Sequence, residues 1–147
     1  MIIGNPHANC CIYLPNVPSL PTAWHWQQAD AMQQLLESNT NHWRKIWVIS
    51  AKILDENHDW RVFLHMSLLH QCCFYCNEAT HHPTATLQFY SGQAIAERLT
   101  GESLLANLKQ HIIQDSHGRW HLPYFDYRQF PNVLIDELRQ QLKKCRD

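Results

Sequence analysis

The sequence predicts an α+β chain that is mostly helical. Apolar residues recur at helical spacing over most of its length, whereas strand-like runs are few and short. Of the 147 residues, 45% are hydrophobic and 17% are charged, which suits one globular domain. A chain of this length buries roughly 70% of its unfolded surface, so we expect it to fold without a disulfide or a metal.

The sequence also argues against a membrane or secreted protein. The longest nearly apolar stretch, residues 62–69, is interrupted by His65 and Ser67 and is far shorter than the roughly 20 residues of a membrane-spanning helix. The first residues offer neither the basic start nor the apolar core of a secretion signal. We therefore expect a soluble cytoplasmic protein whose six cysteines are reduced thiols.

Residues 1–58 are predicted to form an N-terminal helical extension. A proline-rich beginning contains the apolar run Cys10–Leu14, which predicts one short strand. Thr22 can cap a helix over residues 23–38. Residues 42–54 place apolar side chains at helical spacing; their Ile and Val also suit a strand, and we favour the helix.

Residues 59–124 are predicted to form the core of the domain. Asp59 can cap a helix that begins at Trp60. One face of that helix would carry Val62, Met66, Leu69, Cys73 and Cys76. Residues 84–90 alternate between two faces, which predicts a short strand.

The remaining elements follow at short intervals. A helix is predicted over residues 93–99 and is broken at Gly101, and a second helix covers residues 102–112. Residues 113–122 form a predicted hairpin around the turn Asp-Ser-His-Gly. The C-terminal helix covers residues 131–145 and begins at a proline, which a first helical turn tolerates.

The order of helix, strand, helix, tight turn, helix and hairpin over residues 60–124 resembles a winged helix-turn-helix domain. The resemblance is carried by Ser-Gly-Gln-Ala-Ile-Ala-Glu-Arg-Leu at residues 91–99 and by the Thr-Gly-Glu-Ser-Leu-Leu that follows. Ala96 is small enough for a second helix to cross closely, and Gly101 supplies a backbone conformation that other residues resist. The resemblance implies a winged-helix-like core with an extra N-terminal segment and a C-terminal helix.

The resemblance further implies DNA binding by the second helix, which lies in the major groove in such domains, and by the wing. Asn107 and Gln110 would read adenine edges, and Lys109 would contact phosphate. The predicted DNA-binding residues are Ser103, Asn107, Lys109, Gln110 and Arg119. The last helix is the candidate surface for a homodimer.

The charge balance counts against DNA binding. Residues 84–147 hold eight Lys and Arg against seven Asp and Glu, whereas nucleic-acid affinity depends largely on the neutralisation of phosphates. Glu102, at the front of the predicted second helix, would repel phosphate. The winged-helix resemblance therefore also allows a protein-binding module, such as an adaptor or inhibitor, with no nucleic-acid partner.

The chain is rich in histidine, with eleven, and contains one Cys-x-x-Cys pair. A structural zinc site needs four nitrogen or sulfur ligands. The candidate ligands are Cys73, Cys76, His81 and His82. The alternative is that the two thiols share the buried face of a helix, where cysteine behaves as a small apolar residue. We expect no cofactor, with zinc as the possible exception.

No spacing in the sequence marks a catalytic site. There is no glycine-rich phosphate loop and no serine flanked by glycines, and the abundant Cys and His residues single out no pair. The sequence thus predicts a small non-enzymatic regulatory protein that binds DNA. The alternatives are a protein-interaction module and a small zinc-binding protein.

Overall fold

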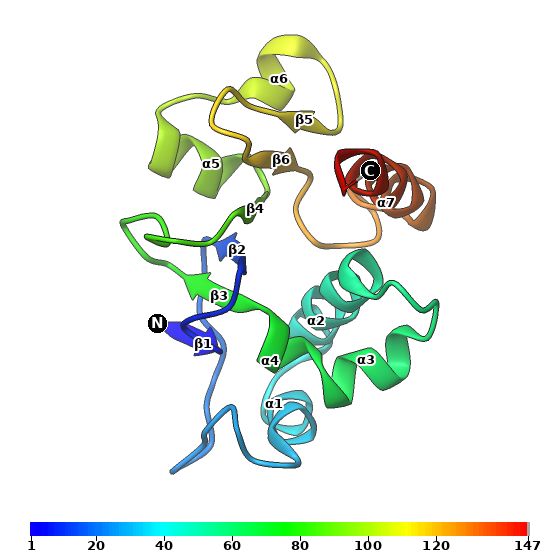
Figure 1. Ribbon diagram of the computed structural model, residues 1–147. Helices are drawn as coiled ribbons and strands as arrows, with labels where there is room; N and C mark the ends of the chain where they lie inside the picture. The colour runs from blue at the N-terminus through cyan, green and yellow to red at the C-terminus, as the bar shows by residue number, and fades with distance from the viewer. Residues whose placement is uncertain (147) are drawn as a thin grey trace.

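A computed structural model describes residues 1–146, with only the backbone at Arg146 (Figure 1). The strands are β1 (Ile2–Gly4), β2 (Cys10–Leu14), β3 (Cys73–Cys76), β4 (Leu87–Ser91), β5 (Ile113–Gln114) and β6 (Trp120–Leu122). The helices are α1 (Ala31–Ser38), α2 (Asn41–Leu54), α3 (Trp60–Met66), α4 (Leu68–Gln71), α5 (Gln93–Thr100), α6 (Leu104–Leu108) and α7 (Asn132–Arg146).

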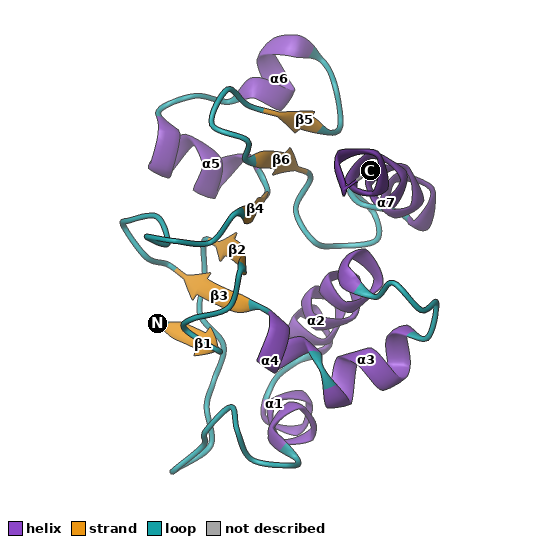
Figure 2. Cartoon of the chain, viewed as in Figure 1, coloured by secondary structure: helices purple, strands orange, loops and turns teal. Residues whose placement is uncertain are grey.

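All six strands belong to one mixed sheet in the order β1-β3-β2-β4-β6-β5 (Figure 2). The central four strands, β3, β2, β4 and β6, are parallel to one another. The two edge strands are antiparallel to their neighbours, β1 to β3 and β5 to β6. The sheet therefore pairs β1 and β2, from the predicted N-terminal extension, with β3 and β4 from the predicted core.

Helices cover the sheet on both faces (Figure 1). Helices α1 to α4 and α7 build the larger apolar core, in which Ile12, Phe74 and Phe89 point from the sheet. Helix α5 covers the opposite face with Ile95 and Ala96, beside α6. Every residue of β2 and β3 is buried, as expected for parallel strands that have helices on both sides.

The prediction of a mostly helical, winged-helix-like fold is wrong. Helices and strands are both present, as in an α+β chain, but helix accounts for 41% of the residues and a six-stranded sheet organises the molecule. Residues 113–122 do form the predicted hairpin, yet β6 also pairs in parallel with β4. Because β6 hydrogen-bonds to β4 as well as to β5, the hairpin is part of the sheet and does not project as a free wing.

The helix predicted from Trp60 ends earlier than its spacing indicated. Val62 and Met66, assigned to its buried face, are 56% and 68% exposed, and Phe63 and Leu64 are buried instead. The chain then enters β3 at Cys73. A short apolar run suits a buried strand as well as a helix, and here the pairing of β3 with β1 and β2 decided between them.

Several elements are confirmed, with changes at their ends. Strand β2, helix α2, helix α5 and the C-terminal helix α7 lie where the sequence placed them. The helix predicted over residues 23–38 begins only at Ala31, because Ala23 has a positive φ of 60° and the Trp24 indole donates a hydrogen bond to the Ala31 carbonyl (3.0 Å). Within the described residues, no helix has the length and apolar character needed to cross a membrane.

The fold predicts the reactivity of the six thiols. Five cysteines are buried and Cys145 is exposed. A thiol reagent added to the native protein should therefore modify Cys145 rapidly and the other five only as the chain unfolds, which absorbance titration can follow. The Cys145→Ser variant should lose the rapid phase, and rapid modification of a second thiol would contradict the burial seen here.

Candidate functional site

The connections that follow β2 and β4 leave towards opposite faces of the sheet. After β2 the chain turns at Asn16 towards the face covered by α1 to α4, whereas after β4 it turns at Gly92 into α5 on the opposite face. Adjacent parallel strands whose connections leave to opposite faces form a topological switch point. In open sheets of this kind, ligands bind outside the carboxyl ends of the strands at such a point.

A cleft of about 710 Å³ lies at the carboxyl ends of β4 and β6. No residue of β2 lines it, but Tyr124 in its lining contacts Asn16, just after β2, and we call it the switch-point cleft for that reason. The first turn of α5, the end of α6 and the segment after β6 supply its walls. Its lining consists of Ser91, Gly92, Gln93, Ala94, Leu105, Gln110, His111, Pro123, Tyr124, Arg128 and Gln129. Its volume lies within the range of small-molecule sites.

Gly92 fixes the shape of the cleft floor. It precedes α5 with φ +94° and ψ 165°, a conformation that is almost confined to glycine. A Cβ atom at this position would lie 3.2 Å from both Cβ and Cδ1 of Tyr124. Since glycine has no side chain to cap α5, the N–H groups of the first turn are left to a ligand or to water.

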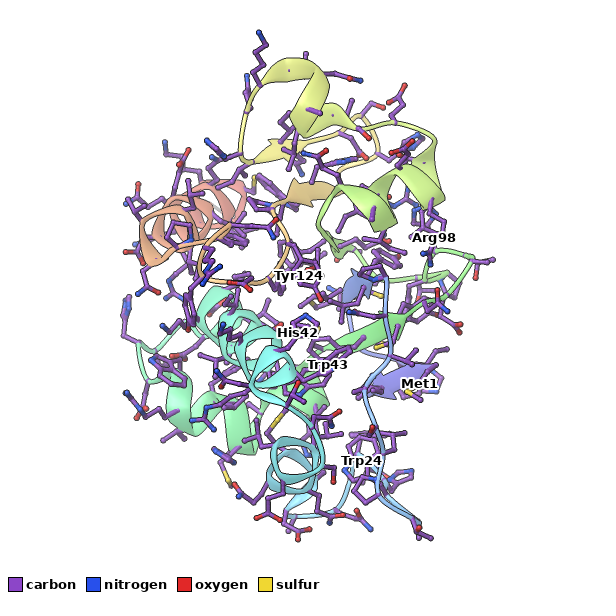
Figure 3. All side chains as sticks on the ribbon, turned by 180° about the vertical axis from the view of Figure 1, so that it is seen from behind. Met1, Trp24, His42, Trp43, Arg98 and Tyr124 are labelled. Atoms are coloured by element: carbon purple, nitrogen blue, oxygen red, sulfur yellow. The ribbon has the colours of Figure 1, made fainter. Side chains whose placement is uncertain are left out.

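Tyr124 joins the cleft to the switch point (Figure 3). Its hydroxyl lies 2.6 Å from Nε2 of His42, in the first turn of α2, and accepts a hydrogen bond from the Asn16 amide (3.1 Å). The hydroxyl also lies 3.4 Å from Asn16 Oδ1, to which it can donate, and the direction of its contact with His42 depends on the imidazole tautomer. Burial raises the pKa of Tyr124, as does the charge of Asp126, against the effect of the Asn16 hydrogen bond, so the phenol is neutral at pH 7.

The polar side chains of the cleft lining are available to a ligand. Arg128 and His111 carry or can carry positive charge, and no lining residue is acidic. Among the described residues, the side chains of Arg128, His111 and the three glutamines of the lining form no hydrogen bond or ion pair with the rest of the chain. The cleft thus combines positive charge with amide groups that can both donate and accept hydrogen bonds.

The structure brings one of the five predicted DNA-binding residues, Gln110, to this cleft. The predicted helix over residues 102–112 is only α6, which ends at Leu108, so Ser103, Lys109 and Gln110 lie outside it. The Ser103 hydroxyl donates to the Glu97 carboxylate (3.0 Å). Asn107 and Lys109 are exposed, and Arg119, predicted on the wing, lies at the amino end of β6 beside Gln88. DNA binding itself stays a prediction, as do a protein partner and a homodimer.

The four candidate zinc ligands do not converge. Cys73 and Cys76 lie on opposite faces of β3, because a strand alternates its side chains where a helix would have aligned them. The His82 ring contacts the Pro6 carbonyl through Nε2 (2.8 Å) and accepts from two backbone N–H groups through Nδ1. Nε2 of His81 lies 2.7 Å from the Tyr90 hydroxyl. In residues 1–146, no three His, Cys, Asp or Glu side chains gather to hold a metal.

Arg119 belongs to a polar cluster on the α5 face of the sheet. Its Nε donates to Gln88 (3.3 Å), and the neighbouring Asp115 pairs with Nε2 of His121 at 2.9 Å. Burial acts to raise the pKa of Asp115, but hydrogen bonds from His121 and from the backbone N–H groups of Arg119 and His117 outweigh it, so the pKa is lowered. We interpret this cluster as a structural network, since its hydrogen bonds are satisfied internally.

A partial signal for the switch-point cleft is present in the sequence. A predicted strand over residues 84–90 is followed at once by Ser91, Gly92 and a helix, which is where a parallel sheet places its ligands. No local pattern marks that strand as parallel, and the same Ser-Gly pair also suits the beginning of a helix-turn-helix. Nothing in the sequence linked Tyr124 to Asn16 and His42, which lie 108 and 82 residues earlier in the chain.

Four parallel strands with helices on both faces, and a ligand-sized cleft at the carboxyl ends of two of them, are the features of a doubly wound sheet protein. The chain belongs to the DUF6942 family, described as a family of unknown function, whose model matches residues 1–143. No curated protein matches the chain, and no solved structure matches it.

The geometry at Gly92 predicts a large loss of stability in Gly92→Ala. The substitution imposes both an unfavourable backbone conformation and crowding against Tyr124, which together cost about 2–4 kcal/mol. Gly101→Ala is the matched control, since φ there is +80° but nothing lies within 4 Å of the added Cβ, so about 1 kcal/mol is expected. Chemical denaturation measures both values, and equal losses would show that Tyr124 does not pack on Gly92.

The lowered pKa of Asp115 predicts a pH-dependent contribution to stability. An acid whose pKa is lowered on folding stabilises the protein above its unfolded pKa, about 3.9, and loses that contribution as the pH falls through the folded value. Asp115→Asn should therefore cost about 1–3 kcal/mol at pH 7 and much less at acid pH. Asp126→Asn is the control, because Asp126 accepts a backbone N–H without a histidine partner. A loss that does not vary with pH would contradict the ion pair.

Proposed function

We propose that this protein binds a nucleotide in the switch-point cleft. The observation that carries the proposal is a cleft of about 710 Å³ at the carboxyl ends of parallel strands, lined by cationic and amide side chains without internal partners and by no carboxylate. Such a lining suits a ligand with an anionic end and a hydrogen-bonding end. A nucleotide has both.

The anionic end of the ligand is assigned to the first turn of α5. The free N–H groups that follow Gly92 and the positive end of the helix dipole favour a phosphate group there. Arg128 lines the same cleft and can donate two parallel hydrogen bonds to phosphate oxygens. His111 adds positive charge when protonated.

The heterocyclic end of the ligand is assigned to the glutamine side chains. Gln93, Gln110 and Gln129 each present a donor and an acceptor, the combination that pairs with the edges of nucleobases. Leu105 and Pro123 offer apolar surface to the face of a ring. The proposal needs no chemical step, so the expectation of a non-enzymatic protein stays a prediction beside it.

The proposal predicts that affinity depends on Arg128. Calorimetric titration with the four common nucleoside monophosphates should detect binding that is stronger than that of the matching nucleosides or of inorganic phosphate. Arg128→Ala should weaken binding by about tenfold or more, because it removes a charge-assisted contact. Arg98→Ala is the control, since Arg98 lies on the same face of the sheet at the far end of α5 and donates to Asn77 (Figure 3).

If none of the four monophosphates binds, or if wild type and Arg128→Ala bind with equal affinity, the proposal is refuted. Where a monophosphate does bind, a short single-stranded oligonucleotide is added as a competitor. It distinguishes a free nucleotide from a nucleotide within a nucleic acid. Displacement of the bound monophosphate by the oligonucleotide would favour the nucleic acid as the natural ligand.

A further inference from the structure

A second cleft, of about 320 Å³, lies between the C-terminal end of α2, the turn that precedes α3, and the beginning of α7. We call it the Asp55 cleft. It shares no lining residue with the switch-point cleft. Its charged lining includes two carboxylates, Asp55 and Asp136, and two permanent cations, Lys52 and Arg139.

The Asp55 carboxylate has an unsatisfied oxygen. The residue is 3% exposed, and its Oδ1 accepts a hydrogen bond from the Asn57 backbone N–H (3.0 Å). Its Oδ2 is buried and has no hydrogen-bond partner among the described residues. Buried polar atoms in folded proteins are nearly always hydrogen-bonded, and a buried carboxylate needs a donor even more than a neutral group does. Asp55 also lines the cleft, so a ligand bound there is placed to supply the missing donor.

The neighbouring cations do not supply that donor. The Lys52 ammonium donates to Asn132 Oδ1 (3.1 Å) and lies 5.2 Å and 4.9 Å from the ring centroids of Trp60 and Tyr127. The Arg139 guanidinium donates to the Lys52 carbonyl, and it has further N–H groups beside the cleft that it lines. Neither cation forms an ion pair with Asp55.

We propose that the Asp55 cleft binds a small zwitterion of the class of free α-amino acids. The ammonium group of the ligand donates to Asp55 Oδ2, and its carboxylate accepts from the guanidinium of Arg139. A simple cation would meet the repulsion of Lys52 and Arg139, and a simple anion would meet that of Asp55 and Asp136. A lining with two charges of each sign complements a ligand that itself carries both.

The size of the cleft agrees with this class of ligand. One water molecule takes about 30 Å³ of liquid volume, so about 320 Å³ has room for about ten non-hydrogen atoms, which is enough for glycine, alanine or leucine. A divalent metal is a poorer occupant, because no three His, Cys, Asp or Glu side chains of residues 1–146 converge on a point. The proposal does not depend on nucleotide binding, which uses the other cleft.

Nuclear magnetic resonance of the ¹⁵N-labelled full chain tests the proposal without any substitution. Glycine, L-alanine and L-leucine are titrated separately to about 20 mM, which covers weak millimolar binding. We expect at least one of them to shift the amide signals of residues 52–60 and 132–139 in a saturable way. Methylammonium and acetate, which carry one charge each, should bind at least about tenfold more weakly. No saturable shift with any of the three amino acids, or equal affinity for acetate, overturns the proposal.

A pair of variants then assigns the contact. Asp55→Asn removes the charge with little change of shape and should weaken amino-acid binding by about tenfold or more. Glu137→Gln makes the same change of charge on α7, one position from Asp136 and outside the cleft lining, and should leave affinity unchanged. Unchanged affinity in a folded Asp55→Asn protein overturns the proposal. If that variant does not fold, the wild-type titrations with the amino acids, methylammonium and acetate decide.

Discussion

The central constraint of this molecule is that its four inner strands are parallel. Each parallel neighbour has to be reached by a connection that crosses a face of the sheet, and such connections are almost always right-handed. From β2 the chain moves one way, to β3, and from β4 it moves the other way, to β6. The two crossings therefore use opposite faces and diverge between β2 and β4. The switch-point cleft lies beside this point, at the carboxyl ends of β4 and β6.

The two faces of the sheet are built differently. The face towards α1 to α4 and α7 is an almost entirely apolar core in which Trp47, Phe74 and Phe89 are buried. The face towards α5 is covered by that helix of eight residues, by the short α6 beside it and by the segment between β3 and β4. Its side chains include Tyr13 and Gln88, which hydrogen-bond to each other. Polar side chains are tolerated on that face because they satisfy one another.

The segment between β6 and α7 connects the two clefts. Tyr124 and Arg128 line the switch-point cleft, and Tyr127 lies against the Lys52 ammonium beside the Asp55 cleft. Asn132, at the start of α7, accepts the hydrogen bond of that same ammonium. One connection of the chain thus supplies side chains to both regions, so the position of α7 on the apolar core helps to define both.

Local patterns in the sequence were sufficient for elements whose stability is local. The apolar run of β2, the spacing of α2, the glycine that ends α5 at Gly101 and the length of α7 all follow from short-range rules. Strand pairing was beyond those rules. Cys73–Cys76 became a strand because β1 and β2 flank it, although they lie about 60 or more residues earlier in the chain.

The sites depend on the same long-range pairing. Tyr124 contacts Asn16 and His42 only once α2 and β2 have taken their places around the sheet. The Asp55 carboxylate is likewise buried only once α2 and α7 have packed. A sequence determines which side chains are available and where helices and strands can start and stop. Which distant strands become neighbours, and therefore which side chains share a cleft, is decided by burial of the whole sheet, and no local spacing encodes it.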